Sequence, residues 1–364
     1  MPENLETSHS KICATYIALW GVYDPLTKTD RAWTADDIQA NLLTDLILSF
    51  AMLNNKTHVD LELQDFNNYK SQISQLAEKY PHLRISLAIG GASEGVKNFS
   101  IMSDNPLLRK TFVQNVENFL RENPKITGID IDWEYPGTSS DPKTAQKEIE
   151  NYINLLKELK EMMKQLGLEN GTSYRLTSAL PPERENLNQN ITAIQEVLDA
   201  INLMTYDYSG AWSQETGHNA PLNKTRLALE NLLQQGLNPQ KVVFGIPFYG
   251  QRWNKIKENG NHGLNAPVRP NSQGFDNGIP YPKVVEYLQN KNFVRYWDST
   301  ASAPYLFSAK KKIFISYNDE ESVRAICQLV NAYNLAGFMA WEYGQDMTGS
   351  LLKEMSGQLL QASD

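Results

Sequence analysis

The chain has 364 residues, enough for one large α/β domain or two of average size, and a net charge of −8. That charge argues against a nucleic-acid partner, because phosphate backbones are bound by clusters of lysine and arginine. Apolar residues make up 41% of the chain and charged residues 21%, as in ordinary globular proteins. No apolar run approaches the roughly 20 residues of a bilayer-spanning helix, so we expect no membrane insertion.

The N-terminal segment, Met1 to Lys11, is polar and lacks the basic start and apolar stretch of a secretory signal. We expect a protein that acts outside the cell, after export by a route without a visible signal or after removal of one. A cytoplasmic location stays open. Cys13 and Cys327 lie in apolar settings, which indicates buried free thiols. We also expect a monomer.

Short apolar runs alternate with longer amphipathic segments along the chain, which is the pattern of βα units and a parallel sheet. Eight runs are predicted as strands: Ile12–Leu19, Leu43–Met52, Arg84–Ile89, Ile126–Trp133, Tyr174–Leu180, Ala200–Tyr206, Lys241–Pro247 and Gly337–Trp341. Between them, apolar residues recur at three- and four-residue steps, which favours helices with one buried face. The fold class is therefore α/β, and we predict a (β/α)8 TIM barrel with its active site at the carboxyl ends of the strands.

The connection after the seventh run is longer than the others. Residues 254–316 pass through Gly, Asn and Pro clusters and then through strand-like pieces such as Lys312 to Tyr317. This length predicts a small α+β insertion between the seventh and eighth strands, beside the barrel mouth. The expected domains are a catalytic barrel of residues 1–253 and 317–364 and an inserted domain of residues 254–316.

The segment from Gly128 to Pro136 holds three acids at alternating positions. Strand side chains alternate between faces, so Asp130, Asp132 and Glu134 share one face, opposite two isoleucines and a tryptophan. The apolar face must pack against helices, which turns the acids into the barrel. Three interior acids roughly 6 to 7 Å apart repel one another, and no core needs them for stability.

Such crowding raises carboxyl pKa values and keeps a proton on one member at neutral pH. Glu134 lies outermost, where a barrel opens to ligand, and we predict it as the proton donor to a leaving group. Asp132 and Asp130 can share a proton beneath it. Paired acids also bind Mg²⁺ or Ca²⁺, but such sites draw ligands from several loops. No histidine or cysteine cluster indicates a transition-metal site, so we expect neither a metal nor a cofactor.

This Asp-x-Asp-x-Glu strand, followed by Tyr-Pro, resembles the signature of family 18 glycoside hydrolases, the chitinases. The similarity extends over most of the chain. The further matching motifs are Ile89-Gly90-Gly91 on the third strand, Met204-Thr205-Tyr206-Asp207 on the sixth, residues 245–250 followed by Arg252 on the seventh, and Trp341 on the eighth. The expected insertion resembles the small α+β domain that deepens the substrate cleft in one chitinase subgroup.

The resemblance implies retaining, substrate-assisted hydrolysis of β-1,4-linked N-acetylglucosamine polymers, with chitin or its oligosaccharides as partners. The acetamido oxygen of the sugar would attack its own anomeric carbon while Glu134 protonates the glycosidic oxygen. Asp132 would bind the acetamido N–H and Asp130 would accommodate its proton. Tyr206 would donate to the acetamido oxygen.

The resemblance also implies contacts to the sugars. Asp207 would bind hydroxyl or acetamido groups, and Trp341 would form the apolar floor beneath the cleaved residue. Further expected contacts are Met204, Tyr249, Arg252, Phe50 and Trp297. Plainer roles stay open: Tyr206 and Asp207 could be polar plugs at a strand end, and Trp341 a core aromatic. His218 fits a loop residue better than a base, and Trp20, Trp212 and Trp253 could stack on sugars or pack in the core.

Two positions depart from the family pattern. The acid that opens the fourth-strand motif is Thr127 here, about 23 Å from Glu134 at ~3.3 Å per residue, so its loss should affect packing. The third-strand serine that hydrogen-bonds the middle aspartate is Ala88 here. Losing one such bond, typically worth about 1 kcal/mol, predicts a shifted pH profile.

Two other functions stay open. One is a non-catalytic, lectin-like chitin-binding protein on the same scaffold, in which the proton donor would be missing, whereas Glu134 is present. The other is an endo-β-N-acetylglucosaminidase acting on N-glycans or peptidoglycan. The expected insertion argues against it, because a deep, walled cleft suits a long linear polymer.

Overall fold

The computed structural model describes residues 11–93, 97–270 and 274–360. The polar N-terminal segment, on which the expectation about a secretory signal rests, lies outside these ranges except for Lys11. Both cysteines are buried and free, as the sequence predicts. No helix within the described ranges is both long enough and apolar enough to span a bilayer.

Eight parallel strands form a closed barrel, which confirms the predicted fold class. They are β1 (Ile12–Ala18), β4 (Asp45–Leu53), β6 (Arg84–Gly90), β7 (Gly128–Asp132), β8 (Arg175–Leu180), β9 (Ala200–Leu203), β10 (Val242–Pro247) and β16 (Gly337–Trp341). They pair in chain order, and β1 also pairs with β16, which closes the sheet. Each strand falls within two residues of a predicted run at its start and three at its end.

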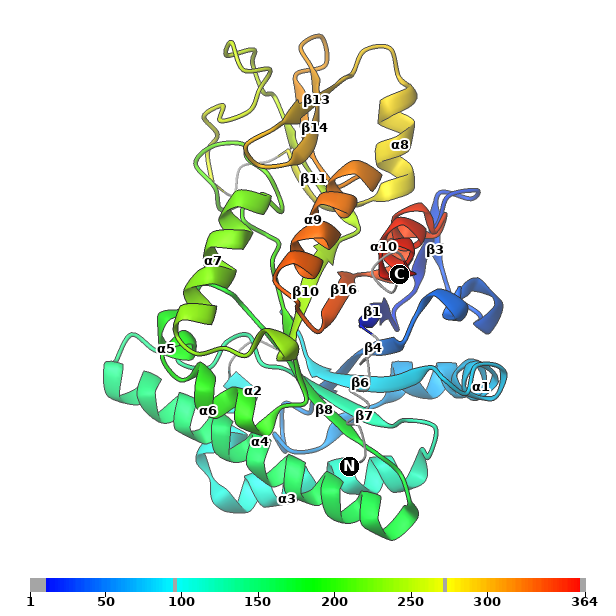
Figure 1. The fold of residues 1–364 in the computed structure, drawn as a ribbon, viewed down its shortest axis with the longest axis vertical. Coiled ribbons are helices and arrows are strands. Elements are labelled where there is room, and N and C mark those ends of the chain that lie inside the picture. Colours follow the sequence, from blue (N-terminus) through cyan, green and yellow to red (C-terminus); the bar gives the residue numbers. More distant parts are fainter. Residues whose placement is uncertain (1–10, 94–96, 271–273, 361–364) are drawn as a thin grey trace, which may run out of the picture.

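Helices surround the barrel (Figure 1). They are α1 (Gln64–Lys79), α2 (Lys97–Asp104), α3 (Pro106–Glu122), α4 (Pro142–Asn170), α5 (Glu185–Asn188), α6 (Ile191–Val197), α7 (Leu222–Gln234), α9 (Glu320–Ala332) and α10 (Ser350–Leu360). Local signals set the ends of the longest one. Asp141 caps the first turn of α4 through the Thr144 N–H, Pro142 opens the helix, and Gly171 ends it with φ 73°. Its buried face, which includes Tyr152 and Leu156, packs against the barrel strands.

The core has two parts, because strand side chains alternate between faces. The larger part lies between the outer face of the barrel and the helices, and it takes Ile129, Ile131 and Trp133 from the acid-rich segment. A smaller interior cluster fills the barrel: Ala14, Tyr16, Ile47, Ala88, Ala200, Val243 and Met339. The acids of β7 therefore face the barrel interior, as the sequence predicts.

A second, antiparallel sheet follows β10 and lies at one end of the barrel, at the top of Figure 1. Its strands are β11 (Tyr249–Asn254), β12 (Phe275–Pro280), β13 (Val294–Asp298), β14 (Ala303–Ser308) and β15 (Ile313–Ser316), and α8 (Tyr281–Gln289) follows β12. Trp253 packs in an apolar cluster of its own with Phe275 and Phe314. The sheet begins at Tyr249, before the expected boundary at residue 254. Only Phe248 separates β10 from β11, so no turn signal marks the change of sheet.

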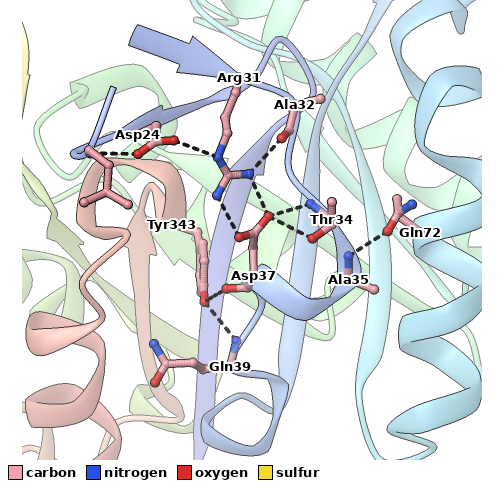
Figure 2. Close-up of polar contacts among 10 residues, drawn as sticks. Asp24, Arg31, Ala32, Thr34, Ala35, Asp37, Gln39, Gln72 and Tyr343 are labelled. Carbon is pink, nitrogen blue, oxygen red and sulfur yellow. Dashed lines mark hydrogen bonds and ion pairs between the residues drawn. The ribbon is translucent and has the colours of Figure 1, made fainter. Parts of the chain in front are cut away.

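The segment after β1 forms a hairpin of β2 (Val22–Asp24) and β3 (Thr29–Arg31), then two short 3-10 turns, η1 (Ala35–Asp37) and η2 (Ala40–Leu42). Arg31 holds this segment together, as Figure 2 shows. Its guanidinium donates to both carboxylate oxygens of Asp37, over 2.8 and 2.7 Å, and lies 3.4 Å from Asp24. Tyr343, in the 3-10 turn η4 (Tyr343–Asp346) after β16, donates to the Asp37 carbonyl over 2.7 Å. The hairpin is thereby tied to the last barrel strand.

Candidate active site

The three predicted acids rise along one line toward the carboxyl end of the barrel. Asp130 is fully buried, Asp132 is 4% exposed, and Glu134, two residues beyond the end of β7, is half-buried. Asp132 and Glu134 line a cavity of about 940 Å³, and Asp130 lies beneath them in the interior. The sequence prediction that these side chains share an interior face is therefore correct.

Burial raises the pKa of Asp132 well above its usual range, and the negative charges of Glu134 and Asp130 raise it further. Burial also raises the pKa of Glu134; a hydrogen bond from the Tyr135 side chain lowers it, and the charge of Asp207 raises it. The acids therefore retain protons at a higher pH than free carboxyls do. A carboxyl that has a raised pKa and faces a cavity can act as a general acid.

Asp132 also has a free acceptor. Its Oδ1 is buried and has no hydrogen-bond partner among the described residues. Buried polar atoms are almost always paired, so an unpaired oxygen on the cavity wall suits a donor that a ligand would bring. An amide N–H is such a donor.

Asp130 is held by three side chains that the sequence reasoning missed. Tyr16 donates to its Oδ2 over 2.8 Å, while Thr177 and Asn202 donate to its Oδ1 over 2.5 and 3.0 Å. Burial raises the pKa of Asp130, and these three hydrogen bonds act in the opposite direction. The donors lie on three different strands, β1, β8 and β9, and only their shared inward orientation could have indicated them.

The cavity lies at the carboxyl ends of the barrel strands, where a TIM barrel carries its active site. Its lining includes Tyr16, Trp20, Phe50, Met52, Asp65, Asp132, Glu134, Tyr135, Glu183, Arg184, Met204, Tyr206, Asp207, Tyr208, Trp212, Asn277 and Trp341. Asn277 lies in β12, so the second sheet contributes to the wall. Met52, Asp65, Tyr135, Glu183, Arg184, Tyr208 and Asn277 were not predicted, because most lie in loops or at element ends without a periodic signal.

Aromatic rings form one continuous side of the cavity. The Trp341 ring lies 5.6 Å from that of Phe50 and 5.4 Å from that of Tyr16, measured between centroids. Trp20 stacks on Phe50 at 6.1 Å and is 62% exposed. Trp212, on the cavity wall as well, is 54% exposed. Flat, exposed rings suit the C–H faces of pyranose sugars.

Tyr206 and Asp207 follow β9 and line the cavity. Burial raises the pKa of Tyr206, so its hydroxyl stays a donor at neutral pH. Asp207 Oδ1 accepts hydrogen bonds from Tyr249 over 2.6 Å and from Gln251 over 3.1 Å. Tyr249, predicted to contact sugar directly, does not line the cavity and instead supports Asp207.

Three further residues singled out from the sequence lie away from the cavity. Arg252 pairs with Asp276 and with the Tyr287 hydroxyl. Trp297 lies in β13 with the Arg295 guanidinium 5.4 Å from its ring. His218 is buried against Asp298, which fits the loop role preferred for it.

Thr127 precedes β7 at the amino end of the strands and donates its N–H to the Ile85 carbonyl over 2.8 Å. It therefore lies at the opposite end of β7 from Glu134, as expected. Within the described ranges, no group of three or more His, Cys, Asp and Glu side chains is arranged to hold a metal ion.

The chain is similar to a known protein family and to curated proteins. The family model "Glycosyl hydrolases family 18" matches residues 12–346. Probable chitinase 2 of Drosophila melanogaster is 29% identical over 370 residues, which cover 93% of this chain and 72% of the fly protein. The chain spans about half the length of three further curated relatives, between 44% and 56%.

Solved structures agree with the sequence relatives. A family 18 N-acetylglucosaminidase from Paenibacillus barengoltzii matches with a TM-score of 0.81 at 29% identity, over 96% of this chain and 99% of that chain. The Group IV chitinase of Ostrinia furnacalis, solved in complex with allosamidin, matches with a TM-score of 0.83 at 27% identity. That match covers 97% of this chain and all of the other.

Proposed function

Since the chain belongs to glycosyl hydrolase family 18, we propose that it hydrolyses β-1,4-linked N-acetylglucosamine polymers with retention of anomeric configuration. One observation carries the proposal: a carboxyl group with a raised pKa, Glu134, lies on the cavity wall next to an aspartate with an unpartnered oxygen, Asp132. The first supplies a proton to a leaving oxygen, and the second accepts an amide N–H. An N-acetylated sugar presents both groups.

In the first step, Glu134 gives its proton to the glycosidic oxygen while the bond from that oxygen to the anomeric carbon breaks. The acetamido oxygen of the same sugar forms a new bond to that carbon and gives a cyclic oxazolinium ion. Tyr206 donates to the acetamido oxygen and orients it. Asp132 accepts the acetamido N–H and stabilises the positive charge, while Asp130 takes up the proton that Asp132 releases.

In the second step, Glu134 is a carboxylate and accepts a proton from water as the water oxygen attacks the anomeric carbon. The bond from the acetamido oxygen breaks and the acetamido group is restored. Two inversions at the same carbon give net retention. Trp341 supplies the floor beneath the reacting sugar, and Asn277 of the second sheet extends the wall that a polymer would follow.

Chitotetraose tests this proposal directly. NMR of the first products distinguishes retention, which gives β-anomers, from inversion, which gives α-anomers and would contradict the mechanism. Glu134→Gln should lower the rate roughly 100-fold or more. Glu161→Gln is the matched control, because Glu161 is exposed on α4 and the substitution makes the same change from carboxyl to amide. Activity that persists in EDTA would exclude a role for the acids in holding a catalytic metal.

The same assay separates the alternatives. A lectin-like protein would bind chitotetraose in calorimetry without releasing products. An endo-β-N-acetylglucosaminidase would cleave a high-mannose glycoprotein faster than chitotetraose. The presence of Glu134 on the cavity wall and the contribution of the second sheet to that wall favour the polymer hydrolase over both.

The monomeric state and the extracellular site of action stay predictions. Light scattering coupled to size-exclusion chromatography checks the first. Chitinase activity measured separately in the culture medium and the lysate of the producing cell checks the second.

A further inference from the structure

Asp130 depends entirely on neutral donors. Among the described residues, its hydrogen bonds come from Tyr16 in β1, Thr177 in β8 and Asn202 in β9. Asn202 also donates to the Tyr16 hydroxyl over 3.0 Å, so two of the donors are linked to each other. No lysine or arginine in the described ranges forms an ion pair or hydrogen bond with Asp130. Its carboxylate form is therefore stabilised by these three bonds alone.

The strand on the other side of Asp130 supplies no donor. Ala88 in β6 is the register partner of Asp130 in β7, and its methyl group belongs to the interior cluster. The two carboxylate oxygens of Asp130 therefore accept different numbers of hydrogen bonds. Oδ1 accepts two hydrogen bonds, while Oδ2 accepts one, from Tyr16.

The titratable groups that face Asp130 carry either no charge or negative charge. Burial keeps Tyr16 on β1, Tyr152 on α4 and Tyr206 after β9 protonated, because it raises the pKa of each hydroxyl. The remaining groups are Asp132 and, beyond it, Glu134. The ion pair of Asp45 with Arg175 lies farther away, at the amino end of the strands, and is reached through a small cavity that Thr177 and Asn202 also line.

We propose that Thr177 and Asn202 are positioning residues that enable Asp130 to share a proton with Asp132 rather than to hold one permanently. The inference rests on the proposed hydrolysis, in which Asp130 must take up and return that proton. Without a donor, the carboxylate of Asp130 is less stable and the aspartate pair keeps two protons up to a higher pH. The acid limb of the pH profile of kcat/KM then moves upward, while the base limb, set by Glu134, stays in place.

Thr177→Val tests this with little change of shape, because only the hydroxyl is replaced. We expect the acid limb to rise by on the order of one pH unit, the worth of one hydrogen bond to a charged group. Thr177→Ser keeps the hydroxyl and should keep the profile. Thr15→Val is the matched control, because Thr15 is a buried strand threonine whose hydroxyl, within the described part of the chain, donates to backbone carbonyls. Asn202→Leu removes a second donor independently and should move the limb in the same direction.

Ala88→Ser gives a prediction of opposite sign. A serine at this position offers Asp130 a further donor, so the acid limb should fall in the otherwise unchanged protein. In the Thr177→Val background, it should return the limb toward its original position. A purely structural role for Thr177 would not give this rescue, since a new hydroxyl on β6 does not repair packing on β8.

The outcomes separate the two proposals. A wild-type protein that does not cleave chitotetraose overturns the proposed function, and this inference with it. An active wild type whose acid limb stays in place in both Thr177→Val and Asn202→Leu overturns the inference alone. Equal movement of both limbs, or the same shift in Thr15→Val, would also overturn it, because either result indicates a general change of structure.

Discussion

Tyr249 donates a 2.6 Å hydrogen bond to Asp207 Oδ1 across the junction between the second sheet and the barrel. Tyr249 opens β11, whereas Asp207 follows the barrel strand β9. Burial raises the pKa of Asp207, while the bonds from Tyr249 and Gln251 act to lower it. The charge of Asp207 in turn raises the pKa of Glu134. The second sheet therefore influences the proton donor through an intermediate carboxylate.

Tyr249→Phe should move the base limb of the pH–rate profile to lower pH. Without the hydrogen bond, the pKa of Asp207 rises and its negative charge is present less often. The pKa of Glu134 then falls, so the proton donor ionises earlier as the pH increases. We expect kcat/KM at neutral pH to fall about threefold to tenfold, equivalent to the loss of one hydrogen bond. The measurement is hydrolysis of chitotetraose across the pH range.

Tyr281→Phe is the control for that variant. The Tyr281 hydroxyl also donates to a carboxylate, Glu320, over 2.9 Å, and neither residue lines the cavity. Its profile should match the wild type. A base limb that is the same in Tyr249→Phe and Tyr281→Phe would contradict the link from the second sheet to Glu134.

Trp341→Ala and Trp297→Ala should separate a sugar platform from a packing residue. Trp341 lines the cavity between Phe50 and Tyr16, so its removal should lower kcat/KM on the order of 10- to 100-fold. Trp297, which the sequence also suggested as a sugar contact, lies outside the cavity beneath Arg295. Its variant should keep kcat/KM within about twofold of the wild type. Equal losses in the two variants would contradict this assignment.

The barrel and the shared face of the three acids could be predicted from the sequence, because each depends on local periodicity. Alternation within nine residues placed Asp130, Asp132 and Glu134 on one face, and the apolar residues between them fixed which face was interior. The eight apolar runs identified the strands for the same reason. Their exact ends were less accurate, since β7 stops at Asp132 and β9 at Leu203, before the predicted Trp133 and Tyr206.

The residues that surround the acids could not be predicted from the sequence, because they come from strands far apart in the chain. Tyr16 lies 114 residues from Asp130 and Asn202 lies 72 away, and no local pattern relates them. The burial of individual tryptophans could not be predicted from local sequence either. Trp253 packs in the second sheet whereas Trp20 is exposed on the cavity wall, a difference set only by tertiary structure.

Glu342→Gln should flatten the pH dependence of stability. Burial raises the pKa of Glu342 to about 7 from an ordinary value of 4.5. Because the folded state prefers the neutral carboxyl, this stabilisation is complete below the ordinary pKa and is lost as the pH rises through about 7. The amide oxygen of glutamine can still accept the N–H groups of Ala18 and Gly344.

Urea unfolding at pH 5 and pH 8 measures the effect. From pH 5 to pH 8, the free energy of unfolding of the wild type should fall by on the order of 2 to 3 kcal/mol more than that of Glu342→Gln. Glu161→Gln, which changes an exposed carboxyl, should follow the wild type. If the difference between the wild type and Glu342→Gln is the same at both pH values, Glu342 is not ionising in this range.

Arg31→Met should loosen the hairpin that follows Trp20 on the cavity wall. In Figure 2, the Arg31 guanidinium spans Asp37 and Asp24 and also donates to the Ala32 carbonyl. A bidentate, partly buried ion pair contributes more to stability than an exposed one. We therefore expect Arg31→Met to lower the free energy of unfolding by about 1 kcal/mol. The KM for chitotetraose should rise with little change in kcat, because the change displaces Trp20 and leaves the three acids in place. Lys79→Met, which removes the exposed ion pair with Asp36, should leave both the free energy of unfolding and KM close to those of the wild type.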